Sequence, residues 1–219
     1  MRIVYLHGFA SSPQSSKAQF FKQKFDQLGV PFEAPQLDEG NFERLTITGQ
    51  LAVVERAVGG RSAVLMGSSL GGYLAALYAT RHPAEVERMI LLAPALQFAS
   101  RWRARFRPED LELWKQQGSA PFFHYGYKTA QRLGYSFVED ADQYEDAPDF
   151  GQPALILHGS EDAVVPPGIS LEFAAARPNV RLQLFPSGHE LTDVLAGLWK
   201  ETSRFLQLGD IIPKIVKSV

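Results

Sequence analysis

A serine framed by two glycines is the clearest chemical feature of the sequence. Gly67, Ser69 and Gly71 form a Gly-x-Ser-x-Gly pattern between an apolar run and an alanine-rich segment. When a strand turns directly into a helix, the residue at the turn is strained and the positions two residues away are crowded, so both must be glycine. Ser69 is therefore a candidate nucleophile. The alternative is a glycine-rich turn with a buried or capping serine, and the neighbouring Ser68, which lacks the glycine frame, is expected to pack or form hydrogen bonds.

A serine hydroxyl becomes a useful nucleophile when a histidine takes its proton and an acid orients that histidine. His189 is the candidate base, because it follows the last apolar strand and its loop should open at the same sheet edge as Ser69. A loop histidine that faces solvent is the alternative. The other four histidines are expected to have structural roles. His7 and His158 should tie loops together by hydrogen bonds, His82 should end a helix, and His124 should lie in an insertion.

Two acids, Glu161 and Asp162, follow the apolar strand that begins at Ala154. Their loop should open at the same edge of a parallel sheet as the serine and the histidine. Asp162 is the candidate for orienting the imidazole and Glu161 is the alternative, because the shorter side chain suits a tight turn anchored by Val165 and Pro166. The other interpretation is that both acids are exposed at the start of a helix.

Attack on a carbonyl group creates a negatively charged oxygen, which needs two fixed N–H donors. The backbone N–H of Leu70, at the start of the predicted helix, is one candidate. The N–H of Phe9, in the loop after the first strand, is the other, because Gly8 permits close approach. We expect neither metal nor cofactor. The chain has no cysteine and no Walker or dinucleotide loop. The residues from His189 resemble the start of a zinc-protease helix, but Asp193 occupies the position where the second histidine is needed.

The composition is that of one globular domain. With 219 residues and 45% hydrophobic content, the chain is long enough to bury a full core. Its net charge of -2 gives no bulk attraction to nucleic acid or to an anionic membrane. The apolar run after Met1 is too short for a signal peptide or a membrane span. We therefore expect a cytoplasmic protein with no nucleic-acid partner.

Apolar strands alternate with amphipathic helices along most of the chain, which predicts a mostly parallel sheet with helices on both faces. The expected strands are Ile3–Leu6, Phe32–Leu37, Ala63–Met66, Val86–Leu92, Ala154–Leu157 and Val180–Phe185. The expected helices are Lys17–Leu28, Ile47–Val58, Tyr73–Ala79, Pro108–Gln117, Ile169–Ala176 and Leu191–Phe205. The alternation fails at about 96–150, where only the 108–117 helix is expected, so this segment is interpreted as an insertion.

With these residues assigned, the chain resembles the α/β-hydrolase superfamily along nearly its whole length. The likeness rests on four motifs: Leu6-His7-Gly8-Phe9, Gly67 to Gly72, Gly159 to Pro166, and Gly188-His189. The chain looks like the small bacterial YqiA/YcfP-like esterases, which share its His-Gly-Phe-x-Ser-Ser-Pro opening. The resemblance implies a triad and an oxyanion hole from the residues already named: Ser69, Asp162 and His189, with the Phe9 and Leu70 N–H groups. The two leading strands of the fuller hydrolase pattern are missing, which predicts a compact sheet.

The expected reaction is hydrolysis of small or medium-sized carboxylic esters through an acyl-enzyme on Ser69. Thioesters, small peptides and amides are alternative substrates, and a binding module without turnover is an alternative function. The insertion lies where hydrolases carry a lid, and its aromatic residues could line an acyl pocket or form a small core. Arginines at 101–107 could attract an anionic substrate, although ion pairs with the acids of 139–146 or exposure to solvent are the preferred interpretation. The apolar tail at 209–219 could pack on the body or on a partner, including a second copy in a homodimer.

Overall fold

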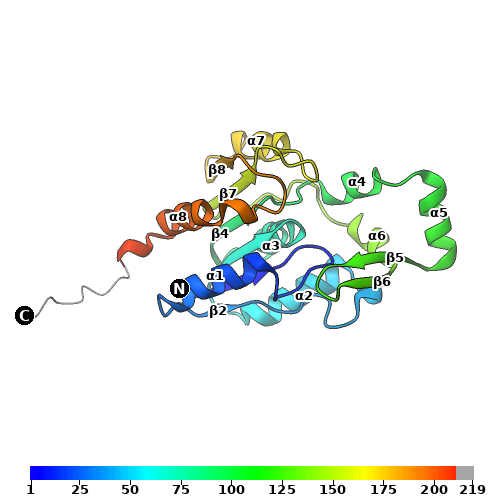
Figure 1. The fold of residues 1–219 in the computed structure, drawn as a ribbon, viewed down its shortest axis with the longest axis horizontal. Helices are drawn as coiled ribbons and strands as arrows, with labels where there is room; N and C mark the ends of the chain where they lie inside the picture. Colours follow the sequence, from blue (N-terminus) through cyan, green and yellow to red (C-terminus); the bar gives the residue numbers. More distant parts are fainter. Residues whose placement is uncertain (211–219) are drawn as a thin grey trace, which may run out of the picture.

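Six parallel strands form the central sheet (Figure 1). The computed structural model describes residues 1–210, so nearly all of the apolar tail at 209–219 lies outside the described residues. The strands follow the order β2-β1-β3-β4-β7-β8, and each neighbouring pair is parallel. Their bounds are β1 (Ile3–Leu6), β2 (Phe32–Glu33), β3 (Ala63–Ser68), β4 (Val86–Leu92), β7 (Ala154–Gly159) and β8 (Val180–Phe185). The predicted strands are confirmed, except that β2 is shorter than the predicted 32–37 strand, since Pro35 has no N–H for a longer ladder.

The order of the strands turns back at β1. Strand β2 pairs with β1 on one side and β3 pairs with it on the other, with Leu6 opposite Gly67 at the carboxyl ends. Ligand sites of open parallel sheets lie outside the carboxyl ends of the strands at such a reversal. The loop that holds Phe9 and the turn that holds Ser69 both begin at this point.

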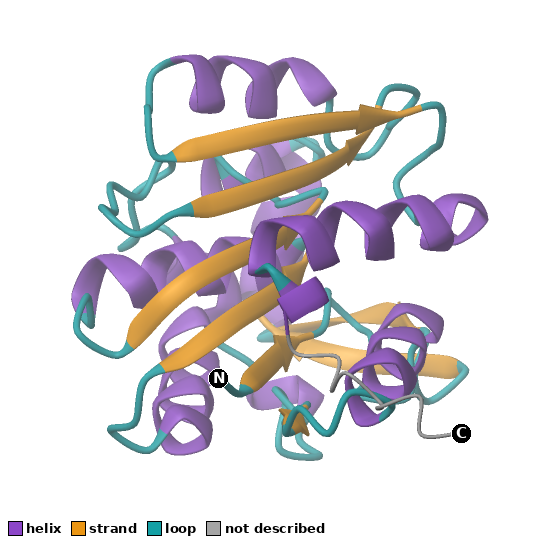
Figure 2. Cartoon of the chain, turned by 90° about the vertical axis from the view of Figure 1, so that its left-hand side faces the viewer, coloured by secondary structure: helices purple, strands orange, loops and turns teal. Residues whose placement is uncertain are grey.

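Two apolar layers cover the two faces of the sheet, because successive residues of a strand point to opposite sides. On β3, Leu65 belongs to the first layer and Met66 to the second. Helices pack on both faces, as Figures 1 and 2 show. The first layer contains α2 (Ile47–Val58), α3 (Leu70–Arg81) and α7 (Pro167–Ala175), and the second contains α1 (Ser16–Asp26) and α8 (Leu195–Leu206).

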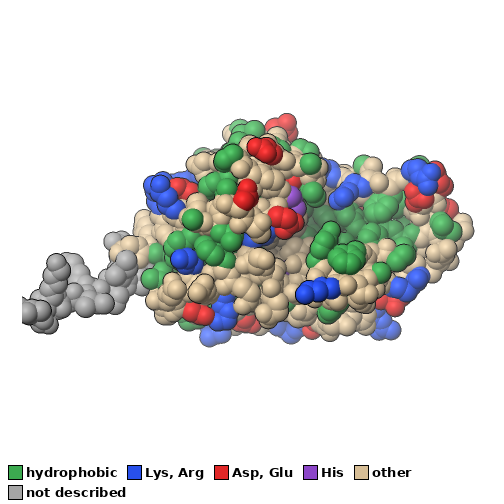
Figure 3. Space-filling model, viewed as in Figure 1, with side chains coloured by type: hydrophobic (Ala, Val, Ile, Leu, Met, Phe, Trp, Pro, Cys, Tyr) green, Lys and Arg blue, Asp and Glu red, His purple; other side chains and the backbone are tan. Residues whose placement is uncertain are grey.

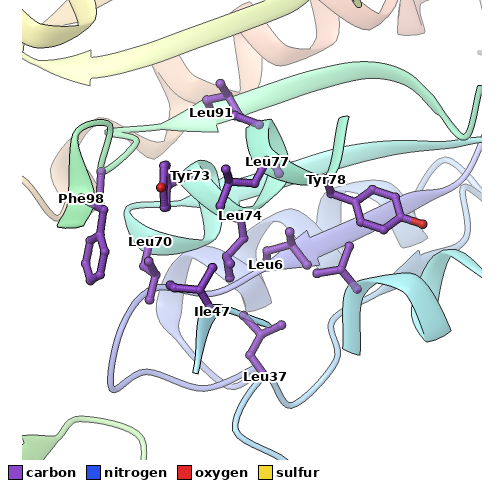
Figure 4. Packing of buried hydrophobic residues seen from close by; sticks show 14 of the residues in the cluster. Leu6, Leu37, Ile47, Leu70, Tyr73, Leu74, Leu77, Tyr78, Leu91 and Phe98 are labelled. Carbon is purple, nitrogen blue, oxygen red and sulfur yellow. The ribbon is translucent and has the colours of Figure 1, made fainter. Parts of the chain in front are cut away.

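Helix α3 is buried on all sides in the first layer. Its residues 70–79 are all buried, and Figure 4 shows Leu70, Leu74 and Leu77 among apolar side chains that include Leu6 of β1. A helix that is apolar all round is stable only inside a protein. The burial of α3 therefore fixes the turn that joins it to β3.

The last helix begins later than the predicted 191–205. Leu191 has a left-handed backbone, with φ of 55°, and a short 3-10 turn, η2 (Thr192–Val194), precedes α8. A left-handed leucine costs free energy, but its side chain is buried in the second layer, and this burial offsets the cost. The loop that carries His189 is therefore longer than the sequence predicts.

Residues 96–150 lie outside the sheet, between β4 and β7 in the chain (Figure 1). They form α4 (Phe98–Arg103), α5 (Pro108–Gln117), β5 (Ser119–His124), β6 (Thr129–Gly134) and α6 (Ser136–Ala141). Helix α5 has the predicted bounds. The expectation of a single helix is wrong, because the short helices α4 and α6 are also present. The antiparallel β5–β6 hairpin was not predicted either, since Pro121 in β5 and the mostly polar residues of β6 do not match a strand pattern.

Aromatic packing and hydrogen bonds hold the insertion against the body. Trp102 and Phe137 are buried, and both contact Phe9 of the loop after β1, with 5.4 and 5.6 Å between ring centroids. The Tyr125 N–H in the hairpin donates to the Ala10 carbonyl at 2.7 Å. The insertion is therefore packed on the loop that follows β1.

Candidate active site

The turn between β3 and α3 holds Ser69 in a strained conformation, with φ of 53° and ψ of -116°. Close backbone contacts surround it. A Cβ atom added to Gly67 would overlap the backbone of Gly71, and one added to Gly71 would overlap the carbonyl group of Leu6. The Ser69 N–H donates to the Leu92 carbonyl at 2.9 Å. Steric contact therefore requires both glycines of the predicted pattern.

Three side chains from three loops meet beside this turn. Nε2 of His189 lies 3.0 Å from the Ser69 hydroxyl oxygen, and its Nδ1 lies 2.7 Å from Oδ2 of Asp162. These residues follow β3, β7 and β8, whose carboxyl ends share one edge of the sheet. When Nδ1–H donates to the carboxylate, Nε2 is left to accept from the hydroxyl. The structure thus brings the three residues together in hydrogen-bonding order.

The Asp162 carboxylate is buried and charged. Its Oδ1 accepts from the backbone N–H groups of Val164 and Val165, each at 2.8 Å, and its side chain has no exposed surface. Burial alone would raise the pKa of this carboxyl group. Hydrogen bonds from His158, His189 and the Val165 N–H outweigh burial and hold the pKa well below its usual range.

Glu161, the alternative acid, does not face the imidazole. Its side chain is exposed, and its backbone N–H donates to the Ser187 carbonyl at 3.0 Å. Neighbouring side chains of the tight turn point in different directions, so Asp162 faces inward while Glu161 faces solvent.

Lys17, which no sequence pattern singled out, supports the loop that carries His189. Its side chain is buried, and its ammonium group donates to the Glu190 carbonyl at 2.6 Å and to the Glu190 carboxylate at 3.3 Å. Burial lowers the pKa of Lys17, against the opposing effect of the Glu190 charge. Lys17 shares a helix face with Phe21, but a lysine there ordinarily extends its charge into solvent. The sequence therefore contained no signal of this contact.

Two backbone N–H groups, that of Phe9 in the loop after β1 and that of Leu70 at the turn, donate no hydrogen bond within residues 1–210. The loop after β1 passes close to the nucleophile candidate, since a Cβ atom added to Gly8 would lie 3.5 Å from the Cβ atom of Ser69. Leu70 is the first residue of α3, where the helix dipole adds partial positive charge. Free N–H groups in this position suit a negatively charged oxygen.

An apolar hollow lies between the body and the insertion. Figure 3 shows hydrophobic side chains gathered in it and a histidine at its edge. The aromatic residues of the insertion between positions 102 and 137 fall into three groups: buried Trp102, Trp114 and Phe137; half-buried Phe106, Phe122 and Tyr135; and exposed Phe123, Tyr125 and Tyr127. The first group forms a core of the insertion, and the rings of the second group pack on Trp114 while keeping part of their surface exposed.

Three further histidines have structural contacts. Nε2 of His7 accepts the Leu37 N–H at 3.2 Å, and burial lowers the pKa of His7 to about 4. His82 stacks on Tyr78 at the end of α3, with 4.2 Å between ring centroids. His124 is buried at the end of β5. Within residues 1–210, none of these three side chains forms a hydrogen bond with the Ser69 hydroxyl, whose imidazole partner is His189.

The arginines at 101–107 are paired in part. Arg103 forms an ion pair with Asp142, one of the expected acids. Arg107, which directly precedes α5, instead pairs with Asp110 of that helix, 2.9 Å away, which corrects the expected pairing with the acids of 139–146. Arg101 donates to a backbone carbonyl of the loop after β7. Exposed ion pairs of this kind contribute little stability, so they mainly orient the side chains.

The described part of the chain contains neither a metal-binding cluster nor a membrane-spanning helix. Residues 1–210 contain no group of three or more His, Cys, Asp or Glu side chains placed to hold a metal ion. Helices α2, α3 and α8 have 12 residues each. No helix of the described range has the length and apolar character needed to cross a bilayer.

Family comparison covers most of the chain. The model of the uncharacterised protein family UPF0227 matches residues 2–200. The chain belongs to this family. The match includes the strained serine turn and the two loops that meet it, so the residues described above are part of the UPF0227 region.

Solved structures share the fold of this UPF0227 member. Alpha/beta hydrolase domain-containing protein 10 from mouse is 23% identical with a TM-score of 0.76, over 98% of this chain and 90% of that chain. Est1E from Butyrivibrio proteoclasticus, solved with ferulic acid bound, is 19% identical with a TM-score of 0.77, over 94% of this chain and 89% of that chain. The α/β-hydrolase fold predicted from the sequence is therefore confirmed.

One curated relative of the UPF0227 member matches over a shorter region. A rice protein (Oryza sativa subsp. japonica) named "Probable 1-acylglycerol-3-phosphate O-acyltransferase" is 29% identical over 125 residues. The match covers 48% of this chain and 29% of the rice protein. The chain thus corresponds to less than a third of that relative's length.

Proposed function

We propose that the protein is a serine hydrolase that cleaves carboxylic esters through an acyl-enzyme on Ser69. The observation that carries this proposal is the hydrogen-bonded chain from the Ser69 hydroxyl through His189 to Asp162, with distances of 3.0 and 2.7 Å. A nucleophile, a base and a group that orients the base are the requirements of nucleophilic catalysis by serine. The apolar hollow is a suitable place for the acyl group.

The reaction begins when Nε2 of His189 takes the Ser69 proton and Oγ attacks the ester carbonyl carbon. Asp162 holds the imidazole and stabilises its positive charge. The Phe9 and Leu70 N–H groups donate to the carbonyl oxygen as it becomes negative. The imidazolium then gives its proton to the leaving alcohol, and the acyl group stays on Ser69. Water, deprotonated by His189, releases the carboxylic acid and restores the serine.

Other acyl compounds are alternative substrates of the same machinery. Thioesters and small amides present the same carbonyl carbon to Ser69, and differ in the group that His189 must protonate. The name of the rice relative adds acyl transfer, in which an alcohol replaces water in the second step. Hydrolysis is preferred here because it needs no second organic substrate.

A fluorophosphonate probe tests the nucleophile. The wild-type protein should form a covalent adduct, and Ser69→Ala should form none, because the probe reacts with a serine activated by a histidine. The neighbouring Ser68→Ala is the matched control and should still react. Adducts on Ser69→Ala would identify another serine as the nucleophile. No adduct on the wild type would favour a binding module over an enzyme.

A substrate panel tests the reaction. Esters, thioesters and amides of graded acyl length should be offered in water, and again with glycerol present as an acyl acceptor. We expect turnover of esters with release of the free acid, and its loss in Ser69→Ala. Faster turnover of thioesters or amides would replace esters as the substrate class. Formation of acyl glycerol at the expense of free acid would indicate a transferase.

A further inference from the structure

A second histidine contacts the carboxylate that faces His189. Nε2 of His158, in β7, lies 3.1 Å from Oδ2 of Asp162 and 2.9 Å from the Val165 carbonyl oxygen. Its Nδ1 lies 2.8 Å from the hydroxyl oxygen of Ser170 in α7. The His158 side chain has no exposed surface. This imidazole therefore joins β7, the acid loop and α7 behind the carboxylate.

The partners of His158 determine which ring nitrogen carries the hydrogen. A backbone carbonyl oxygen can only accept, so the hydrogen of the neutral ring is on Nε2, next to both Val165 and Asp162. Nδ1 then accepts from the buried hydroxyl of Ser170. The same N–H, which faces the Val165 carbonyl at 2.9 Å, also lies 3.1 Å from the carboxylate oxygen that accepts from His189, so the two acceptors share it.

The Asp162 carboxylate is held on both oxygens. Oδ1 accepts from two backbone N–H groups, while Oδ2 lies between the imidazoles of His189 and His158, at 2.7 and 3.1 Å. A carboxylate with donors on both oxygens cannot rotate without losing hydrogen bonds. A second donor on Oδ2 also withdraws electron density, which weakens the attraction of Oδ2 for the His189 proton.

We propose that His158 is a positioning residue, which aims Oδ2 of Asp162 at Nδ1 of His189 and moderates the basicity of that oxygen. This inference rests on the proposed function. His158 acts through Asp162, because it lies behind the carboxylate without exposed surface and cannot touch a substrate.

The pH profile separates this role from simple packing. Without the donor on Oδ2, the carboxylate should hold the His189 proton more tightly, so the acidic limb of kcat/KM should move to higher pH. Lys17 and Arg101 also place positive charge near Asp162, and Lys17 is paired with Glu190. These groups stay in every variant, so they cannot cause a difference between variants.

Three substitutions of His158 test the donor in the full-length protein. His158→Gln can place its amide nitrogen near the position of Nε2, His158→Asn places it near Nδ1, and His158→Leu has no donor. We expect the Leu and Asn variants to lose roughly ten- to hundredfold in kcat with little change in KM, as when a hydrogen bond to a charged group is lost. The Gln variant should recover most of this loss. Ser170→Ala keeps the donor and should stay close to the wild-type kcat.

If the Gln, Asn and Leu variants lose kcat equally, and the acidic limb of the kcat/KM profile does not move, the inference is overturned and His158 has only a packing role. If the Leu variant does not fold, the difference between Gln and Asn decides. Failure of the proposed function is recognised separately, as absence of both a fluorophosphonate adduct and ester turnover in the wild type. In that case NMR titration of the His189 ring still tests the inference, since its midpoint should rise from wild type to His158→Asn and return in His158→Gln.

Discussion

Asp162 carries its negative charge in a fully buried position, where removing a charge from water costs free energy. Its carboxylate has no exposed surface, yet two backbone N–H groups and two imidazoles surround it. These donors offset the cost of burial and keep the carboxyl ionised. The length of the side chain favoured Asp162 over Glu161 at the sequence level. The donors that determine its charge come from contacts that no local pattern contains.

Replacing Asp162 by asparagine should lower kcat on the order of ten-thousand-fold, because an amide NH2 facing Nδ1 favours the wrong imidazole tautomer. The measurement is steady-state hydrolysis of an ester that the wild type turns over. Glu161→Gln makes the same chemical change at the exposed neighbour and should leave kcat close to the wild-type value. A near-normal rate for Asp162→Asn would mean that another acid orients His189.

At the scale of elements, the junction of β3 and α3 depends on backbone contact. Gly67 and Gly71 let the start of α3 pass directly against β1 and β3, which places Ser69 between the end of a buried strand and the start of a buried helix. The sequence indicated this junction well, because glycine spacing and flanking apolar runs are local properties. The β5–β6 hairpin was missed for the opposite reason. Its strands are stabilised by packing on the body, and Pro121 conceals the pattern.

The substitution Gly71→Ala should lower the free energy of unfolding by about 3 kcal/mol or more, since the new methyl group would overlap the Leu6 carbonyl between two rigid elements. Urea unfolding measures the change. Gly168→Ala in α7 is the control, because no atom lies within 4 Å of the added Cβ, and it should be neutral or stabilising by up to about 1 kcal/mol. Similar values for the two variants would contradict this steric explanation.

At the scale of the whole molecule, stability depends on segments held together by buried polar groups. His7 is one of them: it lies at the end of β1 and accepts the Leu37 N–H from the segment after β2. Burial lowers its pKa to about 4 in the folded protein, compared with 6.5 in the unfolded chain. Below pH 6.5 the unfolded chain therefore takes up a proton that the folded protein does not.

The contribution of His7 to stability should be complete above pH 6.5 and should disappear progressively as the pH falls to about 4. Its loss amounts to roughly 3 kcal/mol of unfolding free energy. His7→Gln keeps an acceptor for Leu37 but does not titrate, so its unfolding free energy should fall less steeply over this range. Urea unfolding of both proteins between pH 7 and 4 measures the difference. Parallel curves would show that His7 is not the responsible group.

The sequence by itself determined the parallel sheet, the serine turn and the three loops whose side chains meet beside it. This was possible because strand and helix periodicity is local, and because the carboxyl ends of parallel strands share one edge whatever the details of packing. Only the tertiary structure decided the contacts of His158 and Lys17, the hairpin of the insertion and the inward direction of Asp162 over Glu161. Those features depend on atoms brought together from distant segments, and burial and hydrogen bonding between such atoms have no periodicity in the chain.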